Sequence, residues 1–310
     1  MRGFVAPTDL EWYQFLRARP EIDEVNFWRP GARDFTALTP GEIFFFKLKA
    51  PHDAICGFGL FARFARLRVW QAWDVFGQAN GTPDEYALVE RLQRLSAGPR
   101  APVDLDREIG CIAITQPVFF TPDDWLAAPA DWARQIVSGK GYDFTRREGL
   151  RLWERCLERA AHTHPAPLWT SEAIEMRRTG KPRLIAPRLG QRSFQLAVIE
   201  AYGGACAVTT EHSLPALEAA HIRPWKQGGG HALPNGMLLR RDVHRLFDLG
   251  YVTVRPDLAF AVSRELRDEF ANGRTYYALQ DQRIHVPIDP SDRPDRELLE
   301  WHGEVVFRGA

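Results

Sequence analysis

Helix-forming patterns recur along the first half of the chain. Three segments begin with a Thr that an acidic residue follows three positions later, which is the spacing of a helix capping box. They predict amphipathic helices that begin at Thr8, Thr82 and Thr145 and run to about residues 17, 95 and 160. Pro83 supports the second helix, because the first helical position accepts proline.

Apolar runs with strand character lie between these helices. They are rich in Phe and Ile, are interrupted by Gly and Pro, and cover Glu42–Leu48, Ala54–Phe64 and Ile109–Phe120. Strands mixed with a few short helices predict an α+β fold. We expect a small barrel-like domain with flanking helices over residues 1–160.

The pattern changes after residue 160. Pro and Gly residues interrupt any regular period in residues 161–192, which therefore predict a linker. A helix follows and ends at Gly203-Gly204. Ala216–Ile222 then predicts a strand. From Asn235-Gly236 onward the apolar residues predict a helix that extends through Phe247.

The composition indicates a soluble protein with two domains. The 310 residues are 45% hydrophobic and 26% charged, which excludes collagen-like and wholly disordered chains and allows two cores, in residues 1–160 and 193–310. No run approaches the roughly 18 apolar residues of a membrane span. Asp9 and Glu11 stand where a signal peptide would be apolar. We expect a cytoplasmic protein without a membrane partner.

The four cysteines do not form a metal-binding or disulfide pattern. Cys56, Cys111, Cys156 and Cys206 lie far apart in the sequence and form no C-x-x-C pair. We therefore expect buried free thiols and predict no structural zinc.

A net charge of zero conceals a basic segment. Forty Lys and Arg residues balance forty Asp and Glu residues, yet six basic residues and no acid occur between Arg177 and Arg192. Four of them are candidates for contacting a nucleic-acid backbone: Arg177, Arg178, Lys181 and Arg183. A solvated linker would have the same composition, so both interpretations stay open.

The residues with the clearest chemistry lie between positions 206 and 254. His221 ends the predicted strand, and a Gly-rich loop follows it. His244 and Asp248 are four positions apart on a predicted helix, so they share one face and could share one metal ion. An imidazole opposite such a site could deprotonate a water that attacks a phosphate. A hydrogen-bonded strand-end histidine and a helix-surface pair are the alternatives.

This spacing resembles that of the HNH (ββα-metal) nucleases. Asn235 lies fourteen positions after His221, His244 nine after Asn235, and Asp248 four after His244. The similarity is to the bacterial restriction-type subgroup with LEAAHI, NG, HRLFD and GYVTV segments, and it covers roughly residues 200–307. It implies a C-terminal ββα-metal domain with His221 as general base and His244 and Asp248 as metal ligands. It also implies that Asn235 holds the base-bearing strand against the helix.

One position departs from the family pattern. Many HNH nucleases carry an Asp or His ligand just before the base, where this chain has Ala220. Glu218 lies on the same strand face, and we hypothesise that it reaches the metal directly or through water. A structural Glu that bonds the backbone is the alternative. The resemblance implies one Mg²⁺ or Mn²⁺ ion per active site. Nearby basic residues are candidates for phosphate contacts: Arg223, Lys226, Arg241 and Arg245.

Three segments of the first domain resemble the PUA superfamily, whose EVE, ASCH and SRA relatives bind modified bases: Phe44–His52, Ile55–Gly59 and Ala72–Gly81. The resemblance implies a PUA-like β-barrel that flips a nucleotide and encloses it between aromatic rings. Candidate walls are Trp12, Trp28, Phe46, Phe58, Trp70 and Trp73. Candidate groups for reading the base edge are Asn26, Lys47, His52 and Asp74. Aromatic residues in strands are more often core residues, which remains the alternative for each wall.

Together the two resemblances imply a modification-dependent DNA restriction endonuclease that serves in phage defence. The expected partner is double-stranded DNA that carries a modified base, with modified cytosine as the first candidate. Cutting both strands would need two active sites and therefore favours a homodimer. Two alternatives stay open. One is a non-catalytic protein that binds modified nucleic acid through a decayed HNH domain, which Ala220 favours, and the other is an RNA-directed nuclease.

Overall fold

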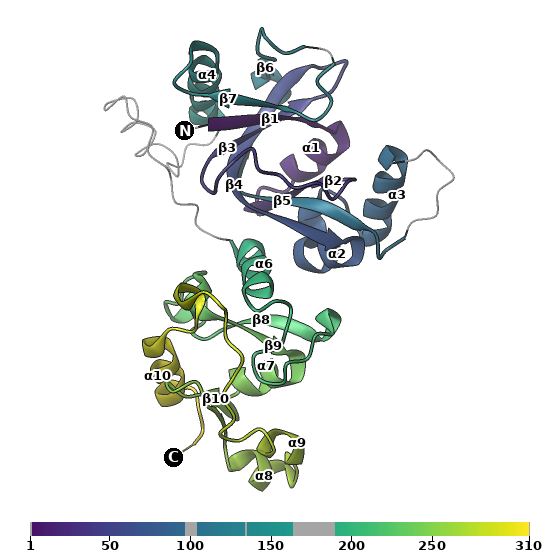
Figure 1. The fold of residues 1–310 in the computed structure, drawn as a ribbon. Helices are drawn as coiled ribbons and strands as arrows, with labels where there is room; N and C mark the ends of the chain where they lie inside the picture. Colours follow the sequence, from purple (N-terminus) through teal and green to yellow (C-terminus); the bar gives the residue numbers. More distant parts are fainter. Residues whose placement is uncertain (1, 97–103, 134, 164–189, 310) are drawn as a thin grey trace. The chain divides into compact units, whose positions relative to one another are not determined.

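Two units make up the chain in this computed structural model, Met1–Gly190 and Gln191–Ala310 (Figure 1). The structure describes residues 2–96, 104–133, 135–163 and 190–309. The basic segment predicted to contact a nucleic-acid backbone, with Arg177, Arg178, Lys181 and Arg183, lies outside the described residues.

The N-terminal unit is built on a seven-stranded sheet with the order β2-β5-β4-β3-β1-β7, and β6 pairs with β4. Strands β1 and β3 are parallel, and the other neighbours in this sheet are antiparallel. The strands are β1 (Arg2–Thr8), β2 (Glu24–Arg29), β3 (Ile43–Leu48), β4 (Ala54–Arg68), β5 (Glu108–Phe119), β6 (Leu126–Ala127) and β7 (Lys140–Asp143).

Both faces of this sheet are buried. Successive residues of β3 alternate between two cores, with Phe45 in one and Phe44 and Phe46 in the other. Helix α4 (Arg147–Thr163) contributes Trp153 to the first core, and helix α1 (Leu10–Arg17) contributes Trp12 to the second. Because each face meets a helix, β3 has a continuous apolar run instead of an alternating one.

The three helices predicted in this unit are present as α1, α3 (Glu85–Ser96) and α4, and α2 (Val69–Phe76) is an additional helix. The cap of α1 is Asp9 and not the predicted Thr8. Asp9 Oδ1 accepts the backbone N–H groups of the second and third residues after it. Thr8 instead ends β1, and its hydroxyl donates to the Ala6 carbonyl.

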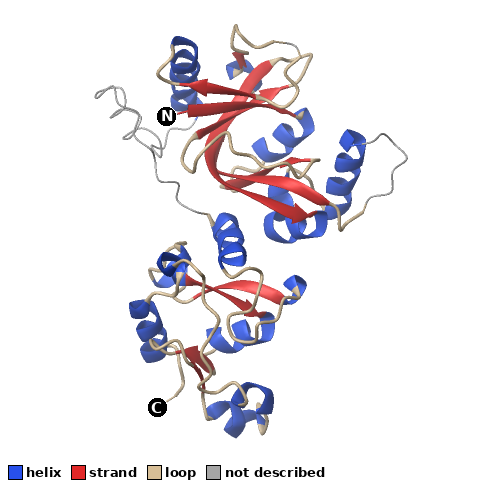
Figure 2. Cartoon of the chain, viewed as in Figure 1, coloured by secondary structure: helices blue, strands red, loops and turns tan. Residues whose placement is uncertain are grey.

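The C-terminal unit contains a β-hairpin followed by a helix, which is a ββα arrangement (Figure 2). Its remaining elements pack around the same core. The elements are α6 (Gln191–Ala201), β8 (Leu217–His221), β9 (Gly236–Arg240), α7 (Arg241–Asp248), β10 (Val252–Val254), β11 (Phe260–Val262), α8 (Glu265–Phe270), α9 (Arg274–Tyr277) and α10 (Arg296–Val305).

The helix predicted from Asn235-Gly236 begins later than expected. Residues Gly236–Arg240 form β9, in which Leu238 pairs with Ala219 of β8, and the helix starts at Arg241. Met237, Leu238 and Leu239 are all almost fully buried. A short run of buried apolar residues has no period that separates a strand from a helix, which explains the error.

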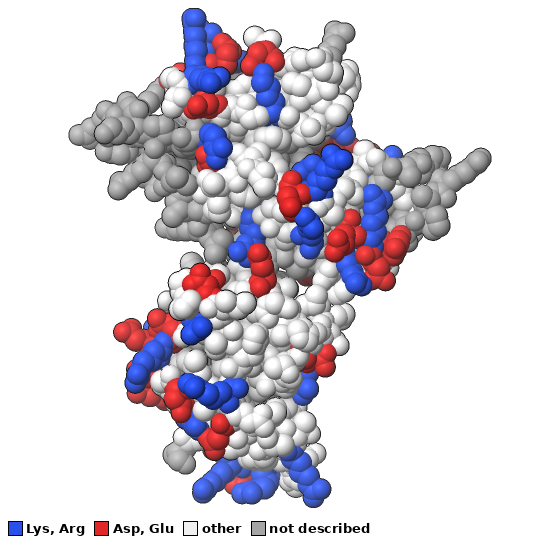
Figure 3. Space-filling view, viewed as in Figure 1, with Lys and Arg blue, Asp and Glu red and all other residues white. Residues whose placement is uncertain are grey.

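The fold class and the state of the cysteines agree with the sequence predictions. The α+β fold class is confirmed. The four cysteines are free and buried. In the described parts of the chain, every helix is too short or too polar to span a membrane. Acidic and basic side chains are interspersed on the face shown in Figure 3, which agrees with the balanced composition.

Candidate functional site

His221 ends β8, at the point where the hairpin opens into a long loop. Its ring stacks on Phe194 of α6, with ring centroids 4.1 Å apart and an interplanar angle of 14°. Its Nε2 lies 3.0 Å from Nδ1 of His231 in the loop. Burial, with smaller contributions from His231 and His244, lowers the pKa of His221 to about 4. The ring is therefore neutral near pH 7 and can accept a proton.

Asn235 fixes the loop between β8 and β9. Its Oδ1 accepts the backbone N–H of Arg223 at 2.9 Å, and its Nδ2 donates to the carbonyls of Arg223 and Gly230 at 2.9 and 2.7 Å. Gly229 is required here, because a Cβ at this position would lie 1.8 Å from the Arg223 carbonyl oxygen. The family resemblance implies that Asn235 holds the strand against the helix, whereas these side-chain contacts hold the loop.

His244 and Asp248 share one face of α7, as their spacing predicts. His244 Nε2 lies 3.6 Å from Oδ2 of Asp248, and His244 Nδ1 lies 2.9 Å from Oε2 of Glu218. A carboxylate accepts hydrogen bonds, so Glu218 fits a His244 ring that is protonated at Nδ1. Nε2 then presents a lone pair next to the Asp248 carboxylate.

This pair has the donor chemistry of a divalent metal site. An imidazole nitrogen and a carboxylate oxygen can share one ion, and water or phosphate oxygens can complete the coordination. Within the described residues, no group of three or more His, Cys, Asp or Glu side chains converges on one point. The protein would therefore supply His244 and Asp248 as ligands, and Glu218 would orient the His244 ring.

The basic side chains near this site differ in their contacts. Arg241 pairs with Glu218 at 3.1 Å, and the guanidinium of Arg223 lies over the ring of Trp301 while its Nε donates to the Gln227 carbonyl. Lys226 and Arg245 are exposed. Lys226 lies in the loop and Arg245 on α7, so a phosphate would have access to both side chains.

Residues 206–255 match the family model described as HNH endonuclease. This segment of the chain is therefore similar to an HNH endonuclease domain. The matched segment of this HNH domain includes β8, β9 and α7, with all four residues of the spacing described above. The sequence resemblance is thereby confirmed.

The chain also resembles solved structures at 12% sequence identity. The ASCH protein from Zymomonas mobilis aligns over 49% of this chain and 93% of its own, with a TM-score of 0.31. A point mutant of that ASCH protein aligns over 49% of this chain and 96% of its own, with a TM-score of 0.33. A structure described as the modification dependent TagI restriction endonuclease aligns over 92% of this chain and 75% of its own, with a TM-score of 0.29. No curated protein matches the sequence.

A cavity of about 380 Å³ lies in the N-terminal unit, apart from the HNH domain in sequence. Six aromatic side chains lie in its walls, and its polar side chains are four charged groups and one hydroxyl. The aromatic residues are Phe4, Trp12, Phe27, Trp28, Phe35 and Phe44, and the polar residues are Asp9, Arg29, Arg33, Lys49 and Ser138.

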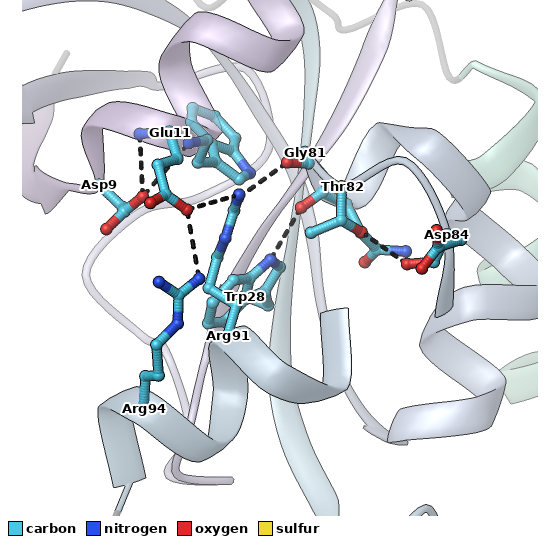
Figure 4. A network of polar contacts seen from close by, with 10 residues as sticks. Asp9, Glu11, Trp28, Gly81, Thr82, Asp84, Arg91 and Arg94 are labelled. Atoms are coloured by element: carbon cyan, nitrogen blue, oxygen red, sulfur yellow. Dashed lines mark hydrogen bonds and ion pairs between the residues drawn. The ribbon is translucent and has the colours of Figure 1, made fainter. Parts of the chain in front are cut away.

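Polar contacts hold the two Trp rings of the cavity, and Figure 4 shows the contact of Trp28. Trp28 Nε1 donates to the Asn80 carbonyl at 2.9 Å, and Trp12 Nε1 donates to the Asn26 carbonyl at 3.2 Å. Gly81 adopts a φ of +76°, and a Cβ at this position would lie 2.2 Å from the Trp12 ring. The backbone next to Asn80 must therefore be glycine for Trp12 to keep its place.

The same network attaches α3 to α1. The guanidinium groups of Arg91 and Arg94 lie 3.1 and 3.3 Å from the Glu11 carboxylate, and Arg91 also donates to the Gly81 carbonyl at 2.8 Å (Figure 4). Arg91 is buried, so this ion pair and its backbone contact fix the helix more firmly than an exposed pair would. The cavity walls are thus pre-organised.

Of the predicted pocket residues, Trp12 and Trp28 line this cavity. The other eight lie outside its lining: Phe46, Phe58, Trp70, Trp73, Asn26, Lys47, His52 and Asp74. Phe46 and Phe58 are fully buried in the two cores of the sheet. Asn26 donates to Asn80 at 2.8 Å and so supports the network behind the walls.

The remaining predicted residues have other contacts. Lys47 is buried and pairs with Asp53 at 2.7 Å, and His52 packs against the ring of Trp125. Trp70 donates to Asp106 at 3.3 Å. Trp73 is partly buried on α2, and Asp74 is exposed.

Sequence reasoning missed the polar cavity residues. In the sequence alone, Asp9 belongs to the start of a helix and Lys49 to a strand-like motif, and neither position suggests a pocket. A usable signal is present at the end of β2, where Arg29 directly follows the aromatic pair Phe27-Trp28 and Arg33 lies in the loop after the strand. Aromatic rings that lead directly into a basic turn are typical of nucleic-acid contacts.

Proposed function

We propose that the chain is a metal-dependent DNA endonuclease that cuts near a modified base. The observation that supports the nuclease activity is that the hairpin and helix of the HNH domain carry His221, His244 and Asp248, with His244 Nε2 3.6 Å from Asp248 Oδ2. A neutral imidazole and a metal-type pair are the groups that hydrolysis of a phosphodiester requires.

The side chains divide the reaction between them. His221 takes a proton from the attacking water, whose oxygen bonds to phosphorus as the bond from phosphorus to the leaving oxygen breaks. His244 and Asp248 would hold a divalent ion, and Glu218, which accepts from His244 Nδ1, would keep the His244 ring oriented. When bound, Mg²⁺ or Mn²⁺ would offset the negative charge that develops on the phosphate. Lys226 and Arg245, whose side chains are exposed, would contact neighbouring phosphates.

The cavity of the N-terminal unit supports the reading of a flipped base. Its volume of about 380 Å³ lies in the range of small-molecule sites, and aromatic walls replace the stacking that a base loses on leaving the duplex. Asp9 uses Oδ1 to cap α1, and among the described residues its Oδ2 has no hydrogen-bond partner. A carboxylate oxygen accepts from an exocyclic amino group, which favours cytosine or adenine derivatives over thymine.

Three basic side chains at the cavity favour a polyanionic partner. Among the described residues, no carboxylate pairs with Arg29, Arg33 or Lys49. A flipped nucleotide stays attached to its strand, so phosphates flank any base that enters the cavity. Basic side chains without carboxylate partners, next to aromatic walls, therefore fit a nucleotide within DNA better than a free small molecule.

Digestion of matched DNAs tests both parts of the proposal. The substrates are identical duplexes with unmodified cytosine, 5-methylcytosine, 5-hydroxymethylcytosine or N6-methyladenine, in Mg²⁺ or Mn²⁺. We expect wild type to cut at least one modified duplex in preference to the unmodified one, and His221→Ala and Asp248→Asn to bind without cutting. Equal cleavage of all duplexes would exclude modification dependence, and binding without cleavage by wild type would indicate a decayed nuclease.

A cavity variant with a matched control tests the reading site. Trp28→Ala should remove the preference for modified DNA, because it removes a wall of the cavity. Tyr86→Ala removes an exposed aromatic side chain of the same unit and should leave the preference unchanged. Sedimentation of the enzyme on modified DNA tests the proposed homodimer, which predicts two copies on a duplex that is cut in both strands.

A further inference from the structure

A second histidine lies directly against the proposed general base. His231 Nδ1 lies 3.0 Å from His221 Nε2, and the ring of His231 stacks on Trp225 at 5.1 Å with an interplanar angle of 10°. Asn235 binds the carbonyl of Gly230, the residue before His231, and so fixes the backbone that carries this ring. His231 is thus placed as firmly as His221.

The contact decides which nitrogen of His221 is available. Its Nε2 faces His231, and among the described residues Nδ1 of His221 has no hydrogen-bond partner. A base needs a lone pair on the nitrogen that faces the water, so Nδ1 must be unprotonated and Nε2 must carry the hydrogen. That hydrogen then points at His231 Nδ1, which accepts it.

Stacking on Phe194 alone would not select which nitrogen of His221 is available as the base. Phe194 holds the plane of the His221 ring. A ring that is flipped about its Cβ–Cγ bond, however, lies in the same plane and keeps the same stacking contact. Only a directional contact selects one orientation and one tautomer. The hydrogen bond to His231 supplies this direction, much as a carboxylate does for the histidine of a hydrolase triad.

We propose that His231 is a positioning residue that holds His221 in its Nε2–H tautomer, with Nδ1 directed at the attacking water. This inference rests on the proposed role of His221 as the base. When Nδ1 takes the proton from water, His221 becomes an imidazolium whose Nε2–H remains bonded to His231 Nδ1. The proton stays on His221 and His231 stays neutral. A neutral acceptor stabilises this cation less than a carboxylate would, so we expect a smaller effect than in a triad.

Two substitutions separate positioning from simple packing. His231→Leu removes the acceptor, whereas His231→Asn places an amide oxygen near the position of Nδ1. We expect His231→Leu to lower the single-turnover cleavage rate by about 10- to 100-fold with unchanged DNA affinity, and His231→Asn to stay within about fivefold of wild type. His212→Leu, at an exposed position of the same unit, is the control for the loss of a histidine.

Side-chain ¹⁵N NMR of the full chain gives a readout that does not depend on cleavage. Wild type should show the Nε2–H tautomer of His221, His231→Asn should keep it, and His231→Leu should show a mixture of tautomers. An Nδ1–H tautomer in wild type, or equal cleavage by His231→Leu and wild type, would overturn the proposal. Equal losses in His231→Leu and His231→Asn would assign a packing role instead.

The same measurements distinguish a failure of the proposed function from a failure of the role inferred for His231. If His221→Ala cleaves like wild type, His221 is not the base, whatever its tautomer. If His221→Ala is inactive and the tautomer is unaffected by His231→Leu, the base is correct and the role of His231 is wrong.

Discussion

His302 connects α10 to the helix that carries the proposed metal ligands. The residue is 2% exposed, its Nε2 lies 3.2 Å from the Phe247 carbonyl, and its Nδ1 lies 2.9 Å from the Thr253 hydroxyl. The ring also stacks on Phe247, with centroids 3.6 Å apart. A neutral ring that donates through Nε2 and accepts at Nδ1 satisfies both contacts. Burial lowers its pKa from 6.5 to about 4, and the bond to Phe247 opposes part of this effect.

The depressed pKa makes the stability of the C-terminal unit depend on pH. In the unfolded chain the ring returns to a pKa near 6.5, so between about pH 6.5 and 4 the unfolded state binds a proton that the folded state does not. The stability that a neutral His302 contributes is therefore complete above pH 6.5 and is lost as the pH falls. The full contribution of neutral His302 to the free energy of unfolding is about 3 kcal/mol, of which about 2 kcal/mol is lost between pH 7 and pH 5.

His302→Gln tests this magnitude, because it removes the titrating group and keeps a donor that can reach the Phe247 carbonyl. The free energy of unfolding is followed at pH 7 and pH 5 by hydrogen exchange of peptides from α7 and α10, corrected for intrinsic rates. Other groups, His221 among them, affect both proteins equally. We expect wild type to lose about 2 kcal/mol more than the variant between the two pH values. Equal losses in both proteins would refute the assignment.

Three further variants test the two sites. Gly81→Ala should lower the free energy of unfolding by about 2 kcal/mol and weaken binding to modified DNA, because its Cβ meets the Trp12 ring at a positive φ; an unchanged melting temperature would contradict this. Glu218→Gln should lower the affinity for Mn²⁺ about tenfold in calorimetry, since an amide orients His244 less strongly than a carboxylate, whereas a complete loss of binding would make Glu218 a direct ligand. Replacement of Arg29, Arg33 and Lys49 by Gln should reduce the slope of log affinity against log salt concentration by about 2 to 3, and an unchanged slope in fluorescence anisotropy would place the phosphate contacts elsewhere.

The strands of the N-terminal unit can be predicted where their composition is unambiguous. Ile43–Leu48 is strand-like by itself, whereas Arg2–Thr8 contains Gly and Pro and has no strand pattern of its own. It becomes β1 because it pairs in parallel with β3, with Phe4 opposite Phe44. Pairing between distant segments is not visible in either segment alone. The same limit explains Met237–Leu239, whose burial against α6 and β8 made a strand resemble one side of a helix.

The two candidate sites differ in how far the sequence could reveal them. The HNH residues lie within 28 positions of one another on a hairpin and a helix, so their spacing carries the geometry. The cavity draws on side chains from Phe4 to Ser138. Trp28 and Trp70 are equivalent by residue type, and the packing of separate elements decides that only Trp28 lines the cavity. His231 was missed because its role depends on how a Gly-rich loop folds back onto β8.

The basic side chains of the two candidate sites differ in their pairing with carboxylates. Near the proposed metal ligands, Arg240 is paired with Asp242 at 2.6 Å and Arg241 with Glu218, so part of the local positive charge is already neutralised. Arg29, Arg33 and Lys49 at the cavity have no such carboxylate partners among the described residues. Since the attraction to DNA grows with the number of phosphates that unpaired basic side chains neutralise, the cavity should bind DNA more strongly than the nuclease site. Under the proposed function, we therefore expect a chain with zero net charge to act on DNA, and cleavage to depend on a base first being held in the cavity.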